Sequence, residues 1–127
     1  MSGIVVDTSV WVDYFAGGEV ALLDDALRQG MVLIPPVVVA ELVSSAHRPR
    51  DRRALIEFLE ELPLCDHDRD HWARVGELRR CCREEGLSIS TPDAHVAQCA
   101  IDADALLLSR DRIFVTLAAR TGLRLAH

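Results

Sequence analysis

The fold of this chain is decided near its N-terminus by the stretch Gly3-Ile4-Val5-Val6-Asp7. Its apolar residues follow one another without polar alternation, which predicts a short strand buried on both faces, as in a parallel sheet. Residues 31–34, 105–108 and 123–126 have the same apolar character. Helical patterns separate these runs. Short strands that alternate with helices indicate an α/β fold, with a central parallel sheet flanked by helices on both faces.

The segments between the strands have the spacing and the stop signals of helices. We expect helices over residues 9–16, about 20–29, 36–46, about 55–62, 69–85, 91–102 and 112–120. Thr91 is predicted to be an N-cap, with Pro92 at the first helical position. The inward face of the helix over residues 69–85 is predicted to carry Trp72, Val75, Leu78 and Cys82.

Composition places the chain among globular proteins of single-domain size. Half of its 127 residues are hydrophobic, so we expect one domain over residues 1–127 with a substantial core. No apolar run approaches the roughly 18 residues of a membrane-spanning helix, and no secretory signal pattern opens the chain. These features predict a cytoplasmic protein with no membrane contact. The four cysteines form no CxxC pair and are expected to be reduced, with Cys82 and Cys99 filling helix faces.

The net charge of −6 counts mildly against a nucleic-acid partner, because such proteins usually carry a basic surface. Acidic residues gathered around a metal ion would weaken this objection, since the ion cancels their charge. The 14 Lys and Arg residues are all arginine, the better bidentate ligand for phosphate. We prefer codon bias as the explanation of the missing lysines. Charge alone therefore does not exclude RNA.

Asp7 and Asp111 each follow a predicted buried strand. Ligands of open α/β sheets bind beyond the carboxyl ends of the strands, so both carboxylates are well placed for chemistry. The alternative for each is a helix cap. Thr8 and Ser9 could cap the first helix equally well, and Ser109 could share the role of Asp111. We favour a functional role for Asp7.

Glu41 and Asp93 are predicted to lie on helices. The residues around Glu41 are apolar nearly all round the helix, which predicts a buried helix and a carboxylate that needs a metal ion or an arginine partner. The sequence does not decide between those two. Asp93 lies in a first helical turn, where the helix dipole favours an acid. It also shares a face with the small residue Ala97, which predicts that it points toward the sheet.

Several carboxylates from different elements are suited to Mg²⁺, a hard cation that takes oxygen ligands. One or two such ions can activate a water molecule and stabilise the leaving oxygen in phosphodiester cleavage. Without metal the carboxylates would repel one another. The four acids together therefore predict a metal-dependent hydrolytic site more strongly than any one of them does.

Four stretches in this order resemble the PIN-domain ribonucleases, and most closely the VapC toxins of toxin–antitoxin pairs. They are Ile4-Val5-Val6-Asp7-Thr8-Ser9-Val10-Trp11-Val12-Asp13-Tyr14-Phe15, Pro35-Pro36-Val37-Val38-Val39-Ala40-Glu41-Leu42, Pro92-Asp93-Ala94-His95-Val96-Ala97 and Leu106-Leu107-Leu108-Ser109-Arg110-Asp111-Arg112-Ile113-Phe114. The C-terminal Thr121-Gly122-Leu123 is similar to the family as well. The likeness spans the whole chain.

The resemblance implies a PIN-like single domain that cleaves RNA with Mg²⁺, or with Mn²⁺ as a substitute. It also implies a homodimer and inhibition by a cognate VapB-like antitoxin. The residues carried over as catalytic and metal-binding acids are Asp7, Glu41, Asp93 and Asp111. Ser9 and Ser109 are weaker candidates, at positions where the family often has a hydroxyl near the metal.

Two positions depart from the family pattern. His95 stands where an aliphatic or small residue is expected, and we interpret it as structural or substrate-facing and not as a metal ligand. Ile113 replaces an acid that is common just after the fourth motif, although Asp111 still supplies a carboxylate. Neither change removes the proposed site.

Other features have competing explanations. His67 and His71 have the i, i+4 spacing of a transition-metal pair, but a polar helix start is the better interpretation. The arginine-rich residues 48–53 suit an RNA backbone and a solvated helix start equally well. The aromatic side chains could stack on bases, although their helical spacing favours core or dimer packing. They are Trp11, Tyr14, Phe15 and Trp72.

We therefore predict an endoribonuclease, a phosphodiester hydrolase that uses a metal-activated water, acting as the toxin of a toxin–antitoxin pair. The alternative is a non-catalytic PIN-fold module that binds RNA or protein, which the loss of an acid would mark. A phospho-acceptor receiver domain would require a lysine, and a dehalogenase-like phosphatase would require an acid in place of Ser9. The motifs do not identify the RNA, its cleavage site, the antitoxin or the number of metal ions.

Overall fold

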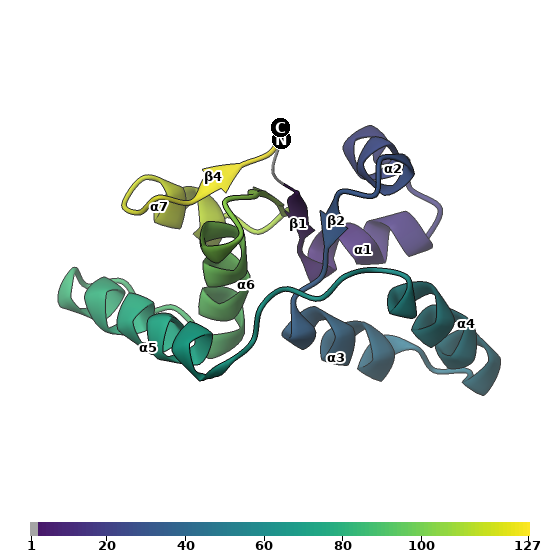
Figure 1. The fold of residues 1–127 in the computed structure, drawn as a ribbon, viewed down its shortest axis with the longest axis horizontal. Helices are drawn as coiled ribbons and strands as arrows, with labels where there is room; N and C mark the ends of the chain where they lie inside the picture. Colours follow the sequence, from purple (N-terminus) through teal and green to yellow (C-terminus); the bar gives the residue numbers. More distant parts are fainter. Residues whose placement is uncertain (1–2) are drawn as a thin grey trace.

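The computed structural model describes residues 3–127, and within them the strands alternate with helices as expected (Figure 1). The chain order is β1 (Ile4–Val6), α1 (Thr8–Phe15), α2 (Ala21–Arg28), β2 (Val32–Leu33), α3 (Pro36–Ser45), α4 (Pro49–Glu60), α5 (Arg69–Glu84), α6 (Thr91–Asp102), β3 (Leu106–Leu108), α7 (Ile113–Ala118) and β4 (Arg124–Leu125). No helix in this part of the chain is long and apolar enough to cross a membrane.

The four strands form one parallel sheet in the order β2-β1-β3-β4. β1 lies inside the sheet, and its three residues Ile4, Val5 and Val6 are all buried. Successive strand side chains point to opposite faces, so burial of all three means that both faces of β1 are covered. Figure 1 shows α5, α6 and α7 grouped on one side of the view and α1 to α4 on the other. The predicted α/β class with flanking helices is confirmed.

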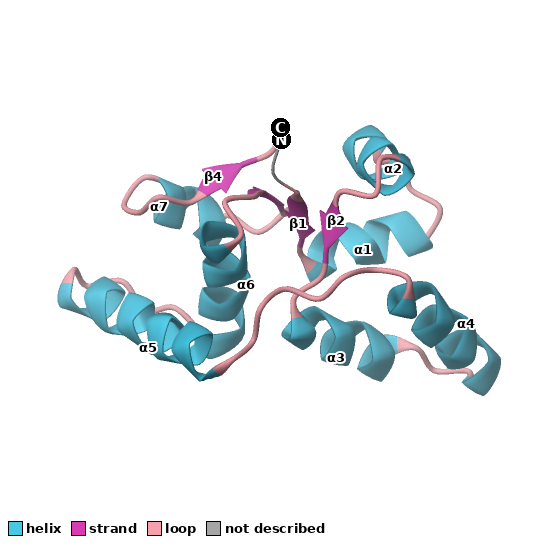
Figure 2. Cartoon of the chain, viewed as in Figure 1, coloured by secondary structure: helices cyan, strands magenta, loops and turns pink. Residues whose placement is uncertain are grey.

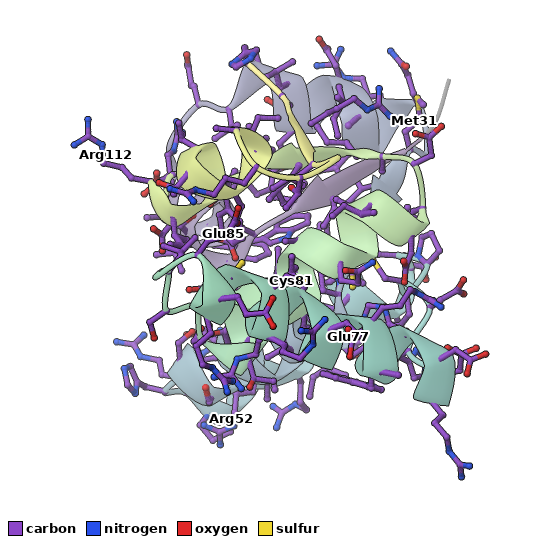
Figure 3. All side chains as sticks on the ribbon, turned by 90° about the vertical axis from the view of Figure 1, so that its left-hand side faces the viewer. Met31, Arg52, Glu77, Cys81, Glu85 and Arg112 are labelled. Atoms are coloured by element: carbon purple, nitrogen blue, oxygen red, sulfur yellow. The ribbon has the colours of Figure 1, made fainter. Side chains whose placement is uncertain are left out.

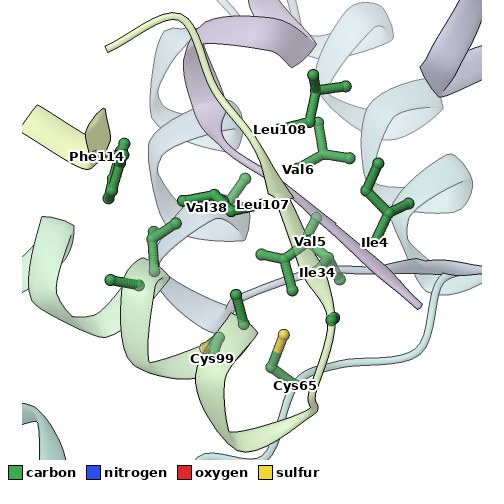
Figure 4. Packing of buried hydrophobic residues seen from close by; sticks show 14 of the residues in the cluster. Ile4, Val5, Val6, Ile34, Val38, Cys65, Cys99, Leu107, Leu108 and Phe114 are labelled. Carbon is green, nitrogen blue, oxygen red and sulfur yellow. The ribbon is translucent and has the colours of Figure 1, made fainter. Parts of the chain in front are cut away.

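The core packs the strands against α3 and α6 (Figure 4). Val5 and Leu107 are wholly buried at its centre, next to each other in the β1–β3 pairing. A second part of the core is aromatic, because the buried Trp11 ring stacks on Phe15 and meets Tyr14 and Phe58 edge to face. Trp11 is therefore a core residue and not a surface for nucleic-acid bases.

A long connection between α4 and α5 runs beside β2, as the pink loop in Figure 2 shows. Ile34 and Leu64 form an isolated parallel bridge there, and the backbone N–H of Cys65 donates to the Ile34 carbonyl at 2.9 Å. This pairing brings the buried Cys65 into the core beside Cys99 (Figure 4). Across residues 3–127 the cysteines are free thiols, as predicted.

Two local predictions about α5 and α6 were wrong. Ser90, and not Thr91, is the N-cap of α6, because its hydroxyl accepts a hydrogen bond from the Asp93 backbone N–H at 3.2 Å. Trp72 was expected to face inward on α5 but is 41% exposed, whereas the preceding His71 is wholly buried. Both errors come from polar side chains that find buried or capping partners, which hydrophobic periodicity does not detect.

Candidate active site

Asp7 follows β1 directly and is the most buried of the four acids, with 8% of its surface exposed. The register that pairs Val6 with Leu108 places Asp7 beside Ser109, and the Asp7 backbone N–H donates to the Leu108 carbonyl at 2.9 Å. Asp7 occupies the N-cap position of α1, but its side chain makes no capping hydrogen bond. The capping alternative for this carboxylate is therefore wrong.

Two hydroxyl groups hold the Asp7 carboxylate instead. Ser109 Oγ donates to Oδ2 at 2.8 Å, and Ser9 Oγ donates to the same oxygen at 3.1 Å. Each hydroxyl also accepts a backbone hydrogen bond, Ser9 from Arg110 at 3.1 Å and Ser109 from Asp111 at 3.0 Å. In this arrangement the two serines position Asp7 and tie the end of β3 to the start of α1.

Asp111 lies in the turn between β3 and α7 and is exposed. Its Oδ1 accepts a hydrogen bond from the Ile113 backbone N–H at 3.1 Å, so this acid does support the start of a helix, as the capping alternative proposed. The capping bond uses one carboxylate oxygen. Capping and a role in the site are thus compatible for Asp111.

Asp93, in the first turn of α6, links the four acids. Its side chain is partly buried, and burial is the largest cause that raises the pKa of this carboxyl. The Ser90 hydrogen bond acts in the opposite direction, but the negative charges of Asp111, Asp7 and Glu41 raise the pKa further. The charges of all three other predicted acids therefore act on Asp93, which indicates that their carboxylates lie near it.

The exposure of Glu41 and its hydrogen-bond partner differ from those predicted. Helix α3 was predicted to be buried all round, but Glu41 is exposed, and Val38 and Leu42 are the buried residues of this helix. The Glu41 carboxylate accepts a hydrogen bond from Thr8 Oγ1 at 2.6 Å, and no arginine is paired with it among the described residues. Thr8 was not identified as a site residue from the sequence, although its position directly after Asp7 is a signal.

No arginine or histidine forms an ion pair with any of the four acids within residues 3–127. Arg110, which precedes Asp111 in the chain, pairs instead with Asp13, with 3.1 Å between Nε and Oδ2. Both partners are about half exposed, so the pair adds little stability. The acidic site formed by Asp7, Glu41, Asp93 and Asp111 thus offers only oxygen donors and carries uncompensated negative charge, a combination that fits Mg²⁺ or Mn²⁺.

The remaining candidate residues do not join the acids. His67 is exposed before α5 begins, with Nδ1 at 3.0 Å from the Cys65 carbonyl, so it does not form a pair with the buried His71. His95 is wholly buried and therefore faces no substrate. Among the basic residues at 48–53, Arg52 donates to the carbonyls of Ala46 and His47 at the start of α4, which is a structural role.

The family model of the PIN domain matches residues 4–120. The chain belongs to the PIN-domain family. Among solved structures, it is similar to the DNA-bound VapBC of Salmonella typhimurium, with a TM-score of 0.79, 18% identity, and coverage of 99% of this chain and 98% of that one.

Two further VapBC structures have the same PIN fold. VapBC2 of Rickettsia felis, bound to a fragment of promoter DNA, gives a TM-score of 0.78 at 22% identity, covering 97% of this chain and 96% of that chain. VapBC-5 of Mycobacterium tuberculosis gives 0.72 at 24% identity, covering 100% and 99%. At these identities the likeness establishes the shared fold of this PIN domain.

Proposed function

We propose that this PIN domain is a Mg²⁺-dependent endoribonuclease that acts as the toxin of a toxin–antitoxin pair. The proposal rests on the surroundings of Asp93, where burial first and then the negative charges of Asp111, Asp7 and Glu41 raise the pKa of the carboxyl. Asp7 and Asp111 follow parallel strands, whereas Glu41 and Asp93 lie on helices. No arginine forms an ion pair with any of the four acids within the described residues. A divalent cation is the simplest partner for such a site.

Bound divalent metal would supply the positive charge that activates water and neutralises the phosphodiester. The residues of the chain would provide its ligands and their positions. Two serine hydroxyls hold the Asp7 carboxylate through its Oδ2, and among the described residues no side chain donates to Oδ1. The Thr8 hydroxyl holds Glu41 through a hydrogen bond of 2.6 Å. Asp93 and Asp111 complete the set, with Asp111 also anchoring α7.

The decisive experiment compares RNA cleavage by the wild-type protein and by Asp7→Asn. We expect 5′-phosphate ends at a defined site with the wild type in Mg²⁺, and a loss of about 100-fold or more in Asp7→Asn and in EDTA. The matched control is Asp25→Asn, which changes an exposed acid on α2 that makes only a surface ion pair with Arg28. RNA that stays intact with the folded wild type in Mg²⁺ and in Mn²⁺ would support the alternative of a non-catalytic RNA- or protein-binding module.

The antitoxin partner is proposed from an apolar groove between α1, α3 and α4. The groove has a volume of about 510 Å³ and is lined by Val12, Phe15, Ala16, Leu42, Ser45, Ala46, Asp51, Ala54, Leu55 and Phe58. Val12 and Phe15 are 49% and 46% exposed, which is unusual for apolar side chains next to a well-packed aromatic core. We propose that a segment of a VapB-like antitoxin covers this groove, next to Glu41 on the same helix α3.

Coexpression tests this part separately from cleavage. An antitoxin encoded beside this chain should copurify with the wild type, and Phe15→Asp should reduce capture strongly, whereas Val115→Asp, at another exposed apolar position 61% accessible, should not. Equal capture by the two variants would contradict docking in the groove. A homodimer is also proposed, and light scattering of the purified chain tests it.

A further inference from the structure

Three buried side chains that do not belong to the acidic site converge between α5 and α6. They are His71, His95 and Cys99, and none has more than 1% of its surface exposed. The Nε2 atom of His71 is 2.7 Å from Nδ1 of His95. The Cys99 sulfur is 3.9 Å from each of these two nitrogens. We propose that this cluster is a second metal site, one that binds Zn²⁺.

The ligand atoms of this cluster differ from those of the acidic site. Two imidazole nitrogens and one sulfur favour an ion of intermediate hardness such as Zn²⁺, whereas the oxygen ligands of the acidic site favour Mg²⁺. Tetrahedral Zn²⁺ with bonds of about 2.0 Å to nitrogen and 2.3 Å to sulfur separates nitrogen from sulfur by about 3.5 Å and two nitrogens by about 3.3 Å. With Nδ1 as the His95 ligand, both sulfur–nitrogen distances of 3.9 Å must shorten by about 0.4 Å. The two imidazoles must move apart by about half an ångström, which breaks their mutual hydrogen bond.

The surroundings of His71 are those of a metal-binding histidine. Its Nδ1 lies 2.8 Å from Asp102 Oδ2, and a histidine ligand commonly donates its second nitrogen to a carboxylate in this way. Asp102 is itself held by Arg74 at 2.9 and 3.0 Å and by Gln98 at 2.8 Å. The donor bond from Nδ1 directs the free electron pair of Nε2 toward His95 and Cys99. The second shell is therefore already in place.

A cover and a further thiol complete the surroundings. The exposed Trp72 ring stacks on His95, with 4.4 Å between centroids and 8° between planes, so it separates the cluster from solvent. Cys65, on the connection that follows α4, is buried beside Cys99 (Figure 4). Binding would release the Cys99 thiol proton to solvent, because the thiolate is the ligand.

The competing explanation is a metal-free chain of hydrogen bonds from Asp102 through His71 to His95. Cobalt separates the two, because Co²⁺ replaces Zn²⁺ and gives strong absorption from thiolate ligands and from tetrahedral geometry. The protein for this test is the Asp7→Asn variant, stripped of metal with EDTA and kept reduced. The substitution weakens the acidic site, so that little Co²⁺ binds there. We expect one equivalent of Co²⁺ to give both signals and one equivalent of Zn²⁺ to remove them.

Variants assign the signal to residues. Cys99→Ser should lose the thiolate band, and Asp102→Asn should weaken Zn²⁺ binding by about 10- to 100-fold. The matched controls are Cys81→Ser and His47→Gln, both at exposed positions; Figure 3 shows Cys81 on the outward face of α5. A folded parent protein without a thiolate band overturns the proposal, and so does a band that persists in folded Cys99→Ser. If Cys99→Ser does not fold, loss of the band in His71→Gln decides instead.

Discussion

The hydroxyl pair that holds Asp7 predicts a specific coupling between two serines. Ser109→Ala removes a 2.8 Å hydrogen bond to a buried carboxylate and a 3.0 Å bond from the Asp111 backbone N–H. Bonds to a charged group contribute about 1.5–3 kcal/mol, and the exposed second bond contributes less. We expect a loss of about 2–3 kcal/mol in the free energy of unfolding. For a chain of this size that lowers Tm by about 8–12 °C.

Ser9→Ala should cost less, about 1–2 kcal/mol, because its bond to Asp7 is longer at 3.1 Å. The double variant should lose about 1 kcal/mol more than the sum of the single variants. With both hydroxyls gone, a carboxylate that is buried in the wild type loses both of its serine donors. Urea denaturation in EDTA measures each free energy. Ser45→Ala, which loses only a bond to the Leu42 carbonyl, is the control.

The Asp7→Asn background provides a second test of the coupling between the two serines. In an Asp7→Asn background the buried charge is absent, so the extra loss in the double serine variant should disappear. Additive effects of Ser9→Ala and Ser109→Ala in the wild-type background would refute the shared role of the two hydroxyls. An equal excess in both backgrounds would show that packing, and not the carboxylate, couples the serines.

Three further predictions concern other parts of the molecule. Gly3→Ala should destabilise the fold by about 1–3 kcal/mol, because a Cβ would lie 2.8 Å from the Met31 carbonyl oxygen. Gly76→Ala, in open space on α5, should instead stabilise it by about 0.5–1 kcal/mol. Equal effects of the two variants in urea denaturation would contradict this. Asp93→Asn should raise the Tm of the metal-free protein slightly, because burial and the neighbouring acids raise the pKa of this carboxyl. Mg²⁺ should reduce the Tm difference between the variant and the wild type. A lower Tm for the variant in EDTA would contradict the repulsion between Asp93 and the neighbouring acids. Burial, with the nearby His71 and His67, lowers the pKa of His95 to about 4 from an ordinary 6.5. The unfolded chain then binds more protons between pH 6.5 and 4, so the metal-free protein should lose up to about 1.4 kcal/mol per pH unit as pH falls through this window. A flat unfolding free energy between pH 7 and 5, or a slope that persists in His95→Gln, would count against a neutral buried His95.

The misjudged residues share a physical cause. The periodicity around Glu41 described α3 as buried on all sides, but three of its valines are only partly covered at the edge of the core, and Glu41 points outward to Thr8. In α5, periodicity assigned the inward position to Trp72, yet the buried residue is His71, whose two nitrogens both find partners. A polar side chain can be buried when its hydrogen bonds are satisfied, and those partners lie far away in sequence.

The sequence by itself determined the α/β class, the burial of β1 and the positions of Asp7 and Asp111 at strand ends. These follow from apolar runs and from the rule that parallel strands end at one edge of the sheet. Only the tertiary structure decided which hydroxyls hold Asp7, because Ser9 and Ser109 lie 100 residues apart and meet through the register of β1 with β3. It also brought His71, His95 and Cys99 together across two helices. Local patterns record which face of an element is buried, whereas contacts between elements depend on how the whole chain packs.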